Sequence, residues 1–452
     1  MRKAFSLYRL LLIALIIGVY GLHATGASAV NGPQFIGFSA ESTALAGAGA
    51  VAVADTSAIN TNPAALSLIQ GTRFDVTAGP LKPLLHHRDV FGNDVDGQND
   101  LFFLGNLGFA KRITQIRGLT VGAGIFTQGG FGTDYRNLAT AFGTRDSSST
   151  FFRYIKFAFA LSYDVTDRLT VAVAPHIGYA DVSLRLFPGT SSIATTPPFF
   201  GVDIRDSCAR NGGLGKLGGS CPSDVVFGAK VGVMYKVAPW MTVGATYTTP
   251  VRFNFTGGQI TLNESAVGLG RVNYDARVAG IIWPQQVDVN FAARPTDRLL
   301  IALTTSWINW AAFNTSEITA TNGSLPPPLN QVNLNIPFNW KDQVVVAVGV
   351  AYALMQDESW KEKDRLVVRA GYNYSNNQVP NETLSPLAPL ILKHRISGGV
   401  GFRFTERWSF DTAFIYSFKN TVTYTNSSLP FGPNATESLE GYYVYNTISY
   451  RF

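Results

Sequence analysis

The feature that most constrains the fold is an alternation of residue types with a period of two, which recurs along most of the chain in segments of about ten residues, the length of a membrane-crossing strand. Between Ile396 and Phe404 every second residue is apolar or glycine, and the residues between them are Ser, Gly and Arg. A soluble sandwich would oppose its apolar face with a charged one. Here the second face is mostly Gly, Ala, Ser and Thr, which predicts an all-β transmembrane antiparallel barrel with a filled lumen.

About fourteen such strands are expected, an even number that places both chain ends on the periplasmic side. Every second connection is short, as at Asp164–Asp167 and Lys236–Pro239, whereas those between are long and rich in Gly, Pro, Asn and Ser. The expected strands are 71–80, 100–111, 117–129, 150–164, 168–185, 223–236, 240–257, 280–295, 298–313, 338–355, 365–378, 391–405, 407–421 and 440–452.

The two ends of the chain indicate export to an outer membrane. Arg2, Lys3 and Arg9 precede an apolar run, and Ala27-Ser28-Ala29 offers a small-x-small cleavage site, so residues 1–29 are expected to be a signal peptide. A helical membrane anchor is the alternative, but the run from Leu10 to Leu22 is shorter than the about 20 residues that a span needs. At the other end, an alternating strand finishes in Phe452, which resembles the signal read by the barrel assembly machinery.

Charge and cysteine content add two further constraints. The leader holds three of the 36 basic residues and none of the 30 acidic ones, so the mature chain is nearly neutral and its composition does not favour nucleic-acid binding. Cys208 and Cys221 are the only cysteines and flank a Gly-rich segment. In an exported chain they most simply form one disulfide in an external loop, with a two-cysteine metal site as the alternative.

The segment from Gly37 to Leu66 is small, apolar and rich in Ala and Gly. Side chains this short bury too little area to offset chain entropy, so the segment must pack inside something larger. Asn62 followed by Pro63 predicts a helix start, with Asn62 as the N-cap. We therefore expect residues 30–70 to form a small helical hatch that plugs a barrel of residues 71–452.

This segment also carries a family resemblance. Ala46-Gly-Ala-Gly-Ala50, Ala54-Asp-Thr-Ser-Ala58 and Asn62-Pro-Ala64, in this order after a signal peptide, resemble the hatch of the outer-membrane long-chain fatty acid and aromatic hydrocarbon transporter family (FadL/TodX-like). Further similar pieces are Phe126–Tyr135, Tyr247–Pro250, Trp283–Val287, Trp307–Trp310, Trp340–Gln343 and Arg369–Tyr372. The cysteine pair and its Gly-rich loop depart from the family pattern.

The resemblance implies a monomeric channel in the outer membrane of a Gram-negative cell, which takes up hydrophobic compounds passively. Ligand would be captured at external loops, enter a lumen pocket bordered by the hatch, and leave sideways into the membrane lipid. A lateral gate is expected at Gly129, Gly130, Phe131 and Gly132, because glycines can break a strand ladder; alternatively these glycines merely begin a loop. The expected ligand-binding residues are Phe35, Phe38, Asn62, Pro63, Ala64, Phe126, Lys156, Arg252 and Arg369.

The basic residues among the expected ligand-binding residues bear on which substrate is bound. A buried fatty-acid carboxylate needs a cationic partner, whereas a hydrocarbon needs none. Alternation places Lys156, Arg252 and Arg369 on the inward face, with Lys230 and Arg403 lower in the lumen. Each of them could instead pair with a carboxylate such as Asp55, Asp288 or Asp411.

No catalytic constellation appears in the sequence, so an enzyme is not expected, nor is a cofactor or a metal. His86 and His87, with Asp89 nearby, are expected to be a solvated loop pair, with a metal site as the alternative, and His176 and His394 are isolated on strands. Gly122–Gly124 and Gly212–Gly215 are not followed by a helix that would make a phosphate cradle. The alternative function is a surface adhesin or structural barrel whose long loops bind partners, with the plug only sealing the lumen.

Overall fold

The computed structural model describes residues 30–98, 101–204, 222–327, 329–360 and 362–452. The expected signal peptide, Cys208 and Cys221 lie outside these residues, as does the segment Gly212–Gly215. Among the described residues, none of the helices has the length and apolar character needed to cross a membrane.

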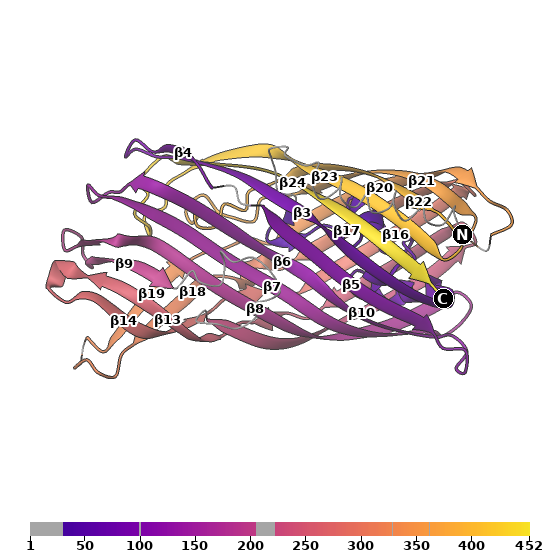
Figure 1. Ribbon diagram of the computed structural model, residues 1–452, viewed down its shortest axis with the longest axis horizontal. Helices are drawn as coiled ribbons and strands as arrows, with labels where there is room; N and C mark the ends of the chain where they lie inside the picture. Colours follow the sequence, from indigo (N-terminus) through magenta and orange to yellow (C-terminus); the bar gives the residue numbers. More distant parts are fainter. Residues whose placement is uncertain (1–29, 99–100, 205–221, 328, 361) are drawn as a thin grey trace, which may run out of the picture.

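Long tilted antiparallel strands close into a barrel (Figure 1). Each strand of the closed ring is hydrogen-bonded to the next in chain order, and the last pairs with the first, Ile448 lying opposite Val76. The ring consists of β3 (Thr72–Arg88), β5 (Phe102–Arg112), β6 (Leu119–Ala139), β7 (Arg145–Asp164), β8 (Leu169–Ser192), β10 (Ser223–Ala238), β11 (Met241–Thr248), β16 (Gln286–Thr296), β17 (Leu299–Ile308), β20 (Gln343–Gln356), β21 (Asp364–Ser375), β22 (His394–Arg403), β23 (Trp408–Tyr424) and β24 (Ala435–Arg451).

Further strands bring the main sheet of the described residues to 22 strands, so about fourteen is too low for the sheet as a whole. Those that extend the wall at the end with the long connections are β4 (Asp94–Asp96), β9 (Phe199–Ile204), β13 (Phe255–Glu264), β14 (Gly270–Ala279), β18 (Thr315–Thr321) and β19 (Gln331–Pro337). The short strands β1 (Val30–Asn31) and β2 (Gln34–Phe35) precede the ring in the chain and join the sheet where Gln34 pairs with Gly129, while β12 (Val251–Arg252) and β15 (Ile282–Trp283) form a separate pair.

Several expected boundaries are therefore wrong. The third strand was expected to end at 129, but β6 continues to Ala139, and β7 begins at Arg145 rather than at 150. Segments 258–280 and 314–337 were expected as loops but contain paired strands. Beyond the bilayer a strand can face water, so its outward residues are polar and the alternation of apolar with small residues disappears.

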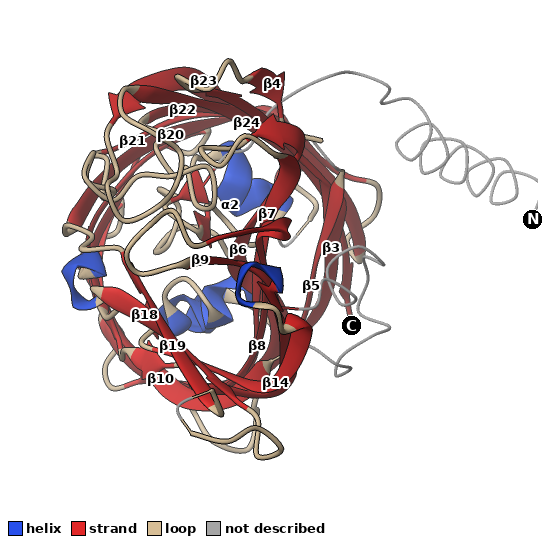
Figure 2. Cartoon of the chain, turned by 90° about the vertical axis from the view of Figure 1, so that its left-hand side faces the viewer, coloured by secondary structure: helices blue, strands red, loops and turns tan. Residues whose placement is uncertain are grey.

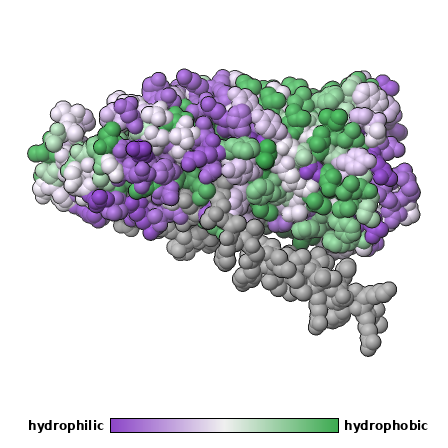
Figure 3. Space-filling view, turned by 90° about the horizontal axis from the view of Figure 1, so that it is seen from above, coloured by the Kyte–Doolittle hydropathy of each residue, from purple (hydrophilic) through white to green (hydrophobic). Residues whose placement is uncertain are grey.

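The outer surface carries the apolar residues that the alternation predicts. Val231 and Val233 on β10, and Val348 and Val350 on β20, are exposed on the barrel wall. Figure 3 shows hydrophobic side chains gathered over the half of the barrel nearer the short turns, whereas the other half is largely hydrophilic. The C terminus lies at the end with the short turns (Figure 1), which is the periplasmic side of an outer-membrane barrel.

Short helices lie inside the ring (Figure 2). They belong to the N-terminal segment, residues 31–70, which comprises α2 (Ala40–Ala44) and the 3-10 helices η1 (Thr56–Ile59) and η2 (Pro63–Leu68). The η2 helix starts as Asn62 and Pro63 predict, since the Asn62 side chain accepts a hydrogen bond from the Ala64 amide. Two further 3-10 helices, η5 (Ser265–Val267) and η6 (Trp310–Ala312), belong to the wall.

Candidate functional site: the lumen and the gap in its wall

The N-terminal segment is bound to the barrel through its backbone carbonyls. Side chains from strands around the ring donate to it: Ser397 to Ala44 O at 2.8 Å, and Thr304 to Ala48 O at 3.1 Å. Further donors are Asn106 to Phe38, Asn373 to Ala46, Ser162 to Ala64 and Lys230 to Thr61. Because short helices leave many carbonyls without an internal partner, these bonds satisfy groups that would otherwise be buried unpaired.

Small residues on the inward face of the wall allow this close packing. A side chain at Gly399 would lie 2.6 Å from Ala44 Cβ, and one at Gly371 would lie 2.6 Å from the Leu45 carbonyl carbon. The Gly- and Ala-rich second face of the strands is thus filled by the segment. Residues such as Ala40, Leu45, Ala64 and Leu66 are completely buried as a result.

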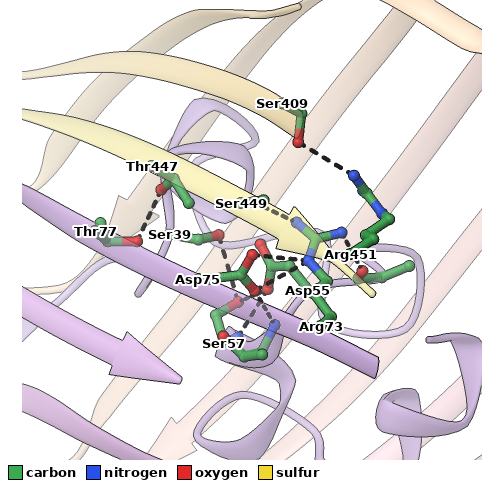
Figure 4. Close-up of polar contacts among 12 residues, drawn as sticks. Ser39, Asp55, Ser57, Arg73, Asp75, Thr77, Ser409, Thr447, Ser449 and Arg451 are labelled. Atoms are coloured by element: carbon green, nitrogen blue, oxygen red, sulfur yellow. Dashed lines mark hydrogen bonds and ion pairs between the residues drawn. The ribbon is translucent and has the colours of Figure 1, made fainter. Parts of the chain in front are cut away.

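An ionic cluster holds the segment near the periplasmic end. Arg369 on β21 lies between Glu41 of α2, at 3.0 Å, and Asp411 of β23, at 2.9 Å. In a second group Arg73 pairs with Asp75 at 2.8 Å, and its Nη1 donates to Ala54 O at 2.7 Å (Figure 4). These contacts tie the segment to strands that are distant in the sequence.

Asp55 lies in the same group but has no cation of its own. Its Oδ1 accepts from the Ser57 amide and hydroxyl, while its Oδ2 is buried without a hydrogen-bond partner among the described residues (Figure 4). Burial, together with the nearby carboxylate of Asp75, raises the pKa of Asp55 to about 6 from its ordinary 3.8. The uncharged form is therefore the one that fits this site.

We expect the packing of the segment to weaken as the pH rises through about 6, because a raised folded-state pKa stabilises the fold only while the proton is bound. Amide hydrogen exchange of residues 56–59, corrected for the intrinsic rate, should be faster at about pH 7.5 than at about pH 5. Asp55→Asn keeps the capping oxygen without the charge, so its exchange should be equal at the two pH values. A pH dependence that persists in Asp55→Asn would contradict this assignment.

The wall of the barrel is interrupted between β5 and β6. Their ladder ends at the pair Asn106 and Phe126, although both strands continue further. A bulge follows in β6 between Thr127 and Gly129. The unpaired edges border a cavity of about 240 Å³, which Gly129, Gly130, Phe131 and Gly132 line. These glycines lie within a strand, so they do not begin a loop.

The gap reaches the lipid-facing surface on one side and the N-terminal segment on the other. Phe103, which is 74% exposed, lines its outer part, and Phe35 lines its inner part. The β2 strand covers the bulge: Gln34 pairs with Gly129, and the Gly130 amide donates to Pro33 O at 2.8 Å. A side chain at Gly129 would lie 2.2 Å from that same oxygen, so only glycine permits this contact.

An aromatic cavity of about 60 Å³ adjoins the gap inside the barrel. Phe131 and Phe152 line both cavities, and their rings stack at 5.7 Å between centroids. From Phe152 the ring contacts continue through Trp283, Trp310 and Trp340 to Phe313 and Phe338. Such a lining, with few polar groups, suits a hydrophobic ligand.

A group of polar side chains lies close by on β7 and β8. Lys156 is buried with no ion pair or hydrogen bond among the described residues, and its Nζ lies 5.8 Å from the ring centre of Tyr154. The Tyr154 hydroxyl and His176 Nε2 are also buried without partners. Three unsatisfied polar groups in an apolar lumen are costly unless a ligand or water meets them.

The other predicted basic residues are placed differently. Arg252 was expected to face inward, but it is exposed on β12, which pairs with β15 in a small sheet separate from the ring. Arg369 is paired as described, Lys230 lies 3.8 Å from Asp288, and Arg403 pairs with Glu362. The pairing alternative therefore describes Arg369, Lys230 and Arg403, and Lys156 remains without a carboxylate.

The predicted ligand-binding residues of the N-terminal segment are dispersed. Phe35 alone among them lines the gap cavity. Phe38 packs edge-to-face on Phe126 at 6.0 Å, and neither lines the gap or the aromatic cavity. Asn62, Pro63 and Ala64 pack on the wall near Gly232 and Ser162.

Sequence reasoning missed the aromatic cavity. Its tryptophans, Trp283, Trp310 and Trp340, lie in the family-like segments of the sequence but are not among the predicted site residues. Three tryptophans beside expected strand ends were the available signal, since this side chain is rarely placed in a loop without a packing partner.

His86 and His87 form structural contacts with nearby carboxylates. His86 and His87 were expected in a loop, but they end the β3 strand. His87 is buried between Glu437, at 2.5 Å, and Asp89, at 3.0 Å, whereas His86 contacts Asp94 and Asp96. The described residues contain no group of three or more His, Cys, Asp or Glu side chains arranged to hold a metal.

Comparison with known proteins adds a family and a fold. Residues 21–452 match the family described as outer membrane protein transport protein (OMPP1/FadL/TodX). No match was found among curated proteins. The chain is similar in structure to the toluene transporter TbuX of Ralstonia pickettii, with a TM-score of 0.70 and 20% identity over 92% of this chain and 99% of that one. It is also similar to the toluene transporter TodX of P. putida, with a TM-score of 0.74, 19% identity, and 93% and 99% of the two chains covered. A FadL homologue of Pseudomonas aeruginosa is similar too, with a TM-score of 0.71, 18% identity, and 93% of this chain and 100% of that one covered.

Proposed function

Since the chain belongs to the OMPP1/FadL/TodX family of outer membrane transport proteins, we propose that it admits hydrophobic small molecules and releases them sideways into the membrane. The observation that carries this proposal is the interrupted β5–β6 ladder, because an apolar cavity there joins the aromatic cavity to the lipid-facing surface. The family and its solved relatives are transport channels rather than enzymes. Nothing in the comparisons supports the alternative of an adhesin.

The path we propose starts at the long external connections and continues into the aromatic cavity. There the ligand exchanges water for aromatic walls, which favours it by about 0.8 kcal/mol per methylene buried. It then passes Phe131 and Phe152 to the gap at Gly129–Gly132 and enters the lipid. Movement along this path requires no energy source, because both the lumen and the lipid are apolar and the solute moves down its concentration gradient.

Residues 30–70 act as a hatch in this proposal. They fill the barrel below the aromatic cavity and bond to strands around the ring, so they close the direct way to the periplasm to polar solutes. A ligand that the hatch keeps from passing directly to the periplasm can leave through the lateral gap instead. The protein is proposed to do this as a single chain, since one barrel contains the lumen, the hatch and the gap.

We further propose that the ligand carries a carboxylate. Lys156, Tyr154 and His176 offer buried donors without partners, and a charged hydrogen bond to a carboxylate would satisfy them. A long-chain fatty acid would place its head group there and its chain among the aromatic rings. A hydrocarbon would leave the three groups unsatisfied.

Binding measured in mild detergent tests this assignment. Lys156→Gln should weaken the affinity for a long-chain fatty acid about tenfold, a change of about 1.4 kcal/mol in binding free energy. The affinity for an alkane of equal length should not change. Arg252→Gln, which removes the same charge from an exposed position, is the control and should bind like wild type. Equal affinities of Lys156→Gln and wild type for the fatty acid would refute the role of Lys156.

Mass spectrometry of ligand extracted from the purified protein tests the function itself. We expect an apolar molecule to co-purify with the barrel. Conductance of polar solutes, with no apolar molecule bound, would instead identify a general pore.

A further inference from the structure

A second cavity has no part in the proposed path. It measures about 460 Å³ and lies at the end of the barrel with the short turns. The N-terminal segment forms its inner boundary through Glu41, Ala52, Ala54, Leu68 and Gln70. The segment therefore separates this cavity from the aromatic cavity. The volume of about 460 Å³ falls within the about 300–1,000 Å³ typical of small-molecule sites.

The lining of this cavity is polar and carries an excess of positive charge. Eight basic and five acidic side chains line it. The basic ones are Arg73, Arg294, Arg298, Lys363, Arg365, Arg369, Arg403 and Arg451, and the acidic ones are Glu41, Asp297, Glu362, Asp364 and Asp411.

Most of the carboxylates are already engaged. Glu41 and Asp411 share Arg369, and Glu362 contacts both Arg403 and Arg451, the latter at 3.2 Å. Asp364 accepts a hydrogen bond from Gln356 at 2.8 Å. The acidic side chains therefore leave part of the positive charge without compensation.

Two arginines supply that uncompensated charge. Arg294 lies near the end of β16 and Arg298 in the turn that follows; both are exposed at the mouth of the cavity, and neither guanidinium forms an ion pair or a hydrogen bond among the described residues. In addition, Arg369 Nε and Arg403 Nε are buried without hydrogen-bond partners. Guanidinium groups present forked donors that match the two oxygens of a carboxylate or phosphate.

We propose that this cavity binds a small polyvalent anion bearing carboxylate or phosphate groups, with Arg294 and Arg298 as its principal ligands. Several forked donors line one open cavity, so an anion with two or more charged groups can contact them together. An apolar solute would have to desolvate these cations without compensating them, which separates this site from the hydrophobic path. The site faces the periplasm and is accessible without movement of the hatch.

Calorimetric titration of the purified full barrel in a neutral detergent tests the proposal, with citrate and pyrophosphate as probes at constant ionic strength. The two probes distinguish a carboxylate ligand from a phosphate ligand. We expect saturable binding of at least one of them at one site per chain, weakened by added sodium chloride because salt screens the attraction. The double variant Arg294→Gln/Arg298→Gln should weaken that binding at least about tenfold, the loss of roughly one charge-assisted hydrogen bond.

The matched control removes the same charge at the same end but outside the cavity. Arg117→Gln/Arg168→Gln changes two exposed arginines of neighbouring turns and should bind the probes like wild type. An equal loss in this control would overturn the proposal, because attraction would then be a property of the whole rim. Binding no stronger than that of chloride would overturn it as well.

We expect the double variant Arg294→Gln/Arg298→Gln to take up hydrophobic compounds like wild type, since neither side chain lines the gap or the aromatic cavity. The anion site and the transport path can thus fail independently.

Discussion

A cross-link that closes the gap between β5 and β6 is expected to abolish uptake of the hydrophobic compound while leaving its binding intact. Phe102 on β5 faces Gly132 on β6 across the gap, and a side chain at Gly132 would lie 3.3 Å from Phe102 Cζ. Phe102→Cys and Gly132→Cys, joined by a short bifunctional thiol reagent, would bridge these edges. Both native cysteines would be replaced by serine in this background.

The physical reason for the loss is that the backbone ladder between β5 and β6 ends at Asn106 and Phe126, so no ladder pair holds the two edges at a fixed separation beside Gly129–Gly132. A ligand can pass only if the edges stay apart, and the cross-link prevents this. The aromatic cavity lies on the lumen side of the gap, so a ligand that enters from the external side should still bind there. Uptake into proteoliposomes and equilibrium binding measure the two properties separately.

A cross-link on the same strands where their ladder is intact provides the control. Leu107 and Ile125 are directly paired, so cysteines at these positions join β5 to β6 without closing the gap. This variant should transport normally after cross-linking. Normal uptake with the Phe102–Gly132 bridge formed would count for a path straight through to the periplasm.

Removal of residues 30–66 is expected to leave an assembled barrel that leaks small polar solutes. The ring closes through β24 and β3 without any contribution from these residues, and its backbone ladder holds the wall together. The wall side chains that now bond to the segment, such as Ser397, Thr304 and Asn106, would then face water. A lumen lined by such groups admits polar solutes.

Assembly and leakage need separate measurements. Heat-dependent electrophoretic mobility reports the folded barrel, and efflux of a small dye from proteoliposomes reports the leak. Wild-type protein at the same density in the membrane is the control and should retain the dye. A folded deletion variant that also retains it would contradict the role of the segment as a hatch.

The sequence predicted the parts of the fold that a lipid environment imposes. Around Ile396–Phe404 and Trp408–Phe418 the outward residues must be apolar and the inward ones small, so the period of two is visible. β18 and β19 escaped prediction for the opposite reason. Their outward residues meet water, as Thr315–Thr321 shows, and a polar strand outside the bilayer resembles a loop.

The candidate site was predicted in part for similar reasons. Gly129, Gly130 and Gly132 indicated a break in the ladder because glycine adopts bulged backbone geometry that other residues disfavour, and all three line the gap cavity. The direction of Arg252 could not be predicted, because it depends on how a two-residue strand leaves the ring. The aromatic cavity depends on Trp283, Trp310 and Trp340 meeting from distant strand ends, which only the closed barrel brings together.

Photoaffinity labelling tests most directly whether the ligand leaves sideways. A fatty acid with a photoreactive group near the end of its chain, bound to the full protein in proteoliposomes, would be irradiated and the labelled peptides identified by mass spectrometry. The lateral path predicts labels on Phe131 and Phe152 and, at the outer edge of the gap, on Phe103. Labels confined to Leu68 and Val367, which line the periplasmic cavity, would contradict it.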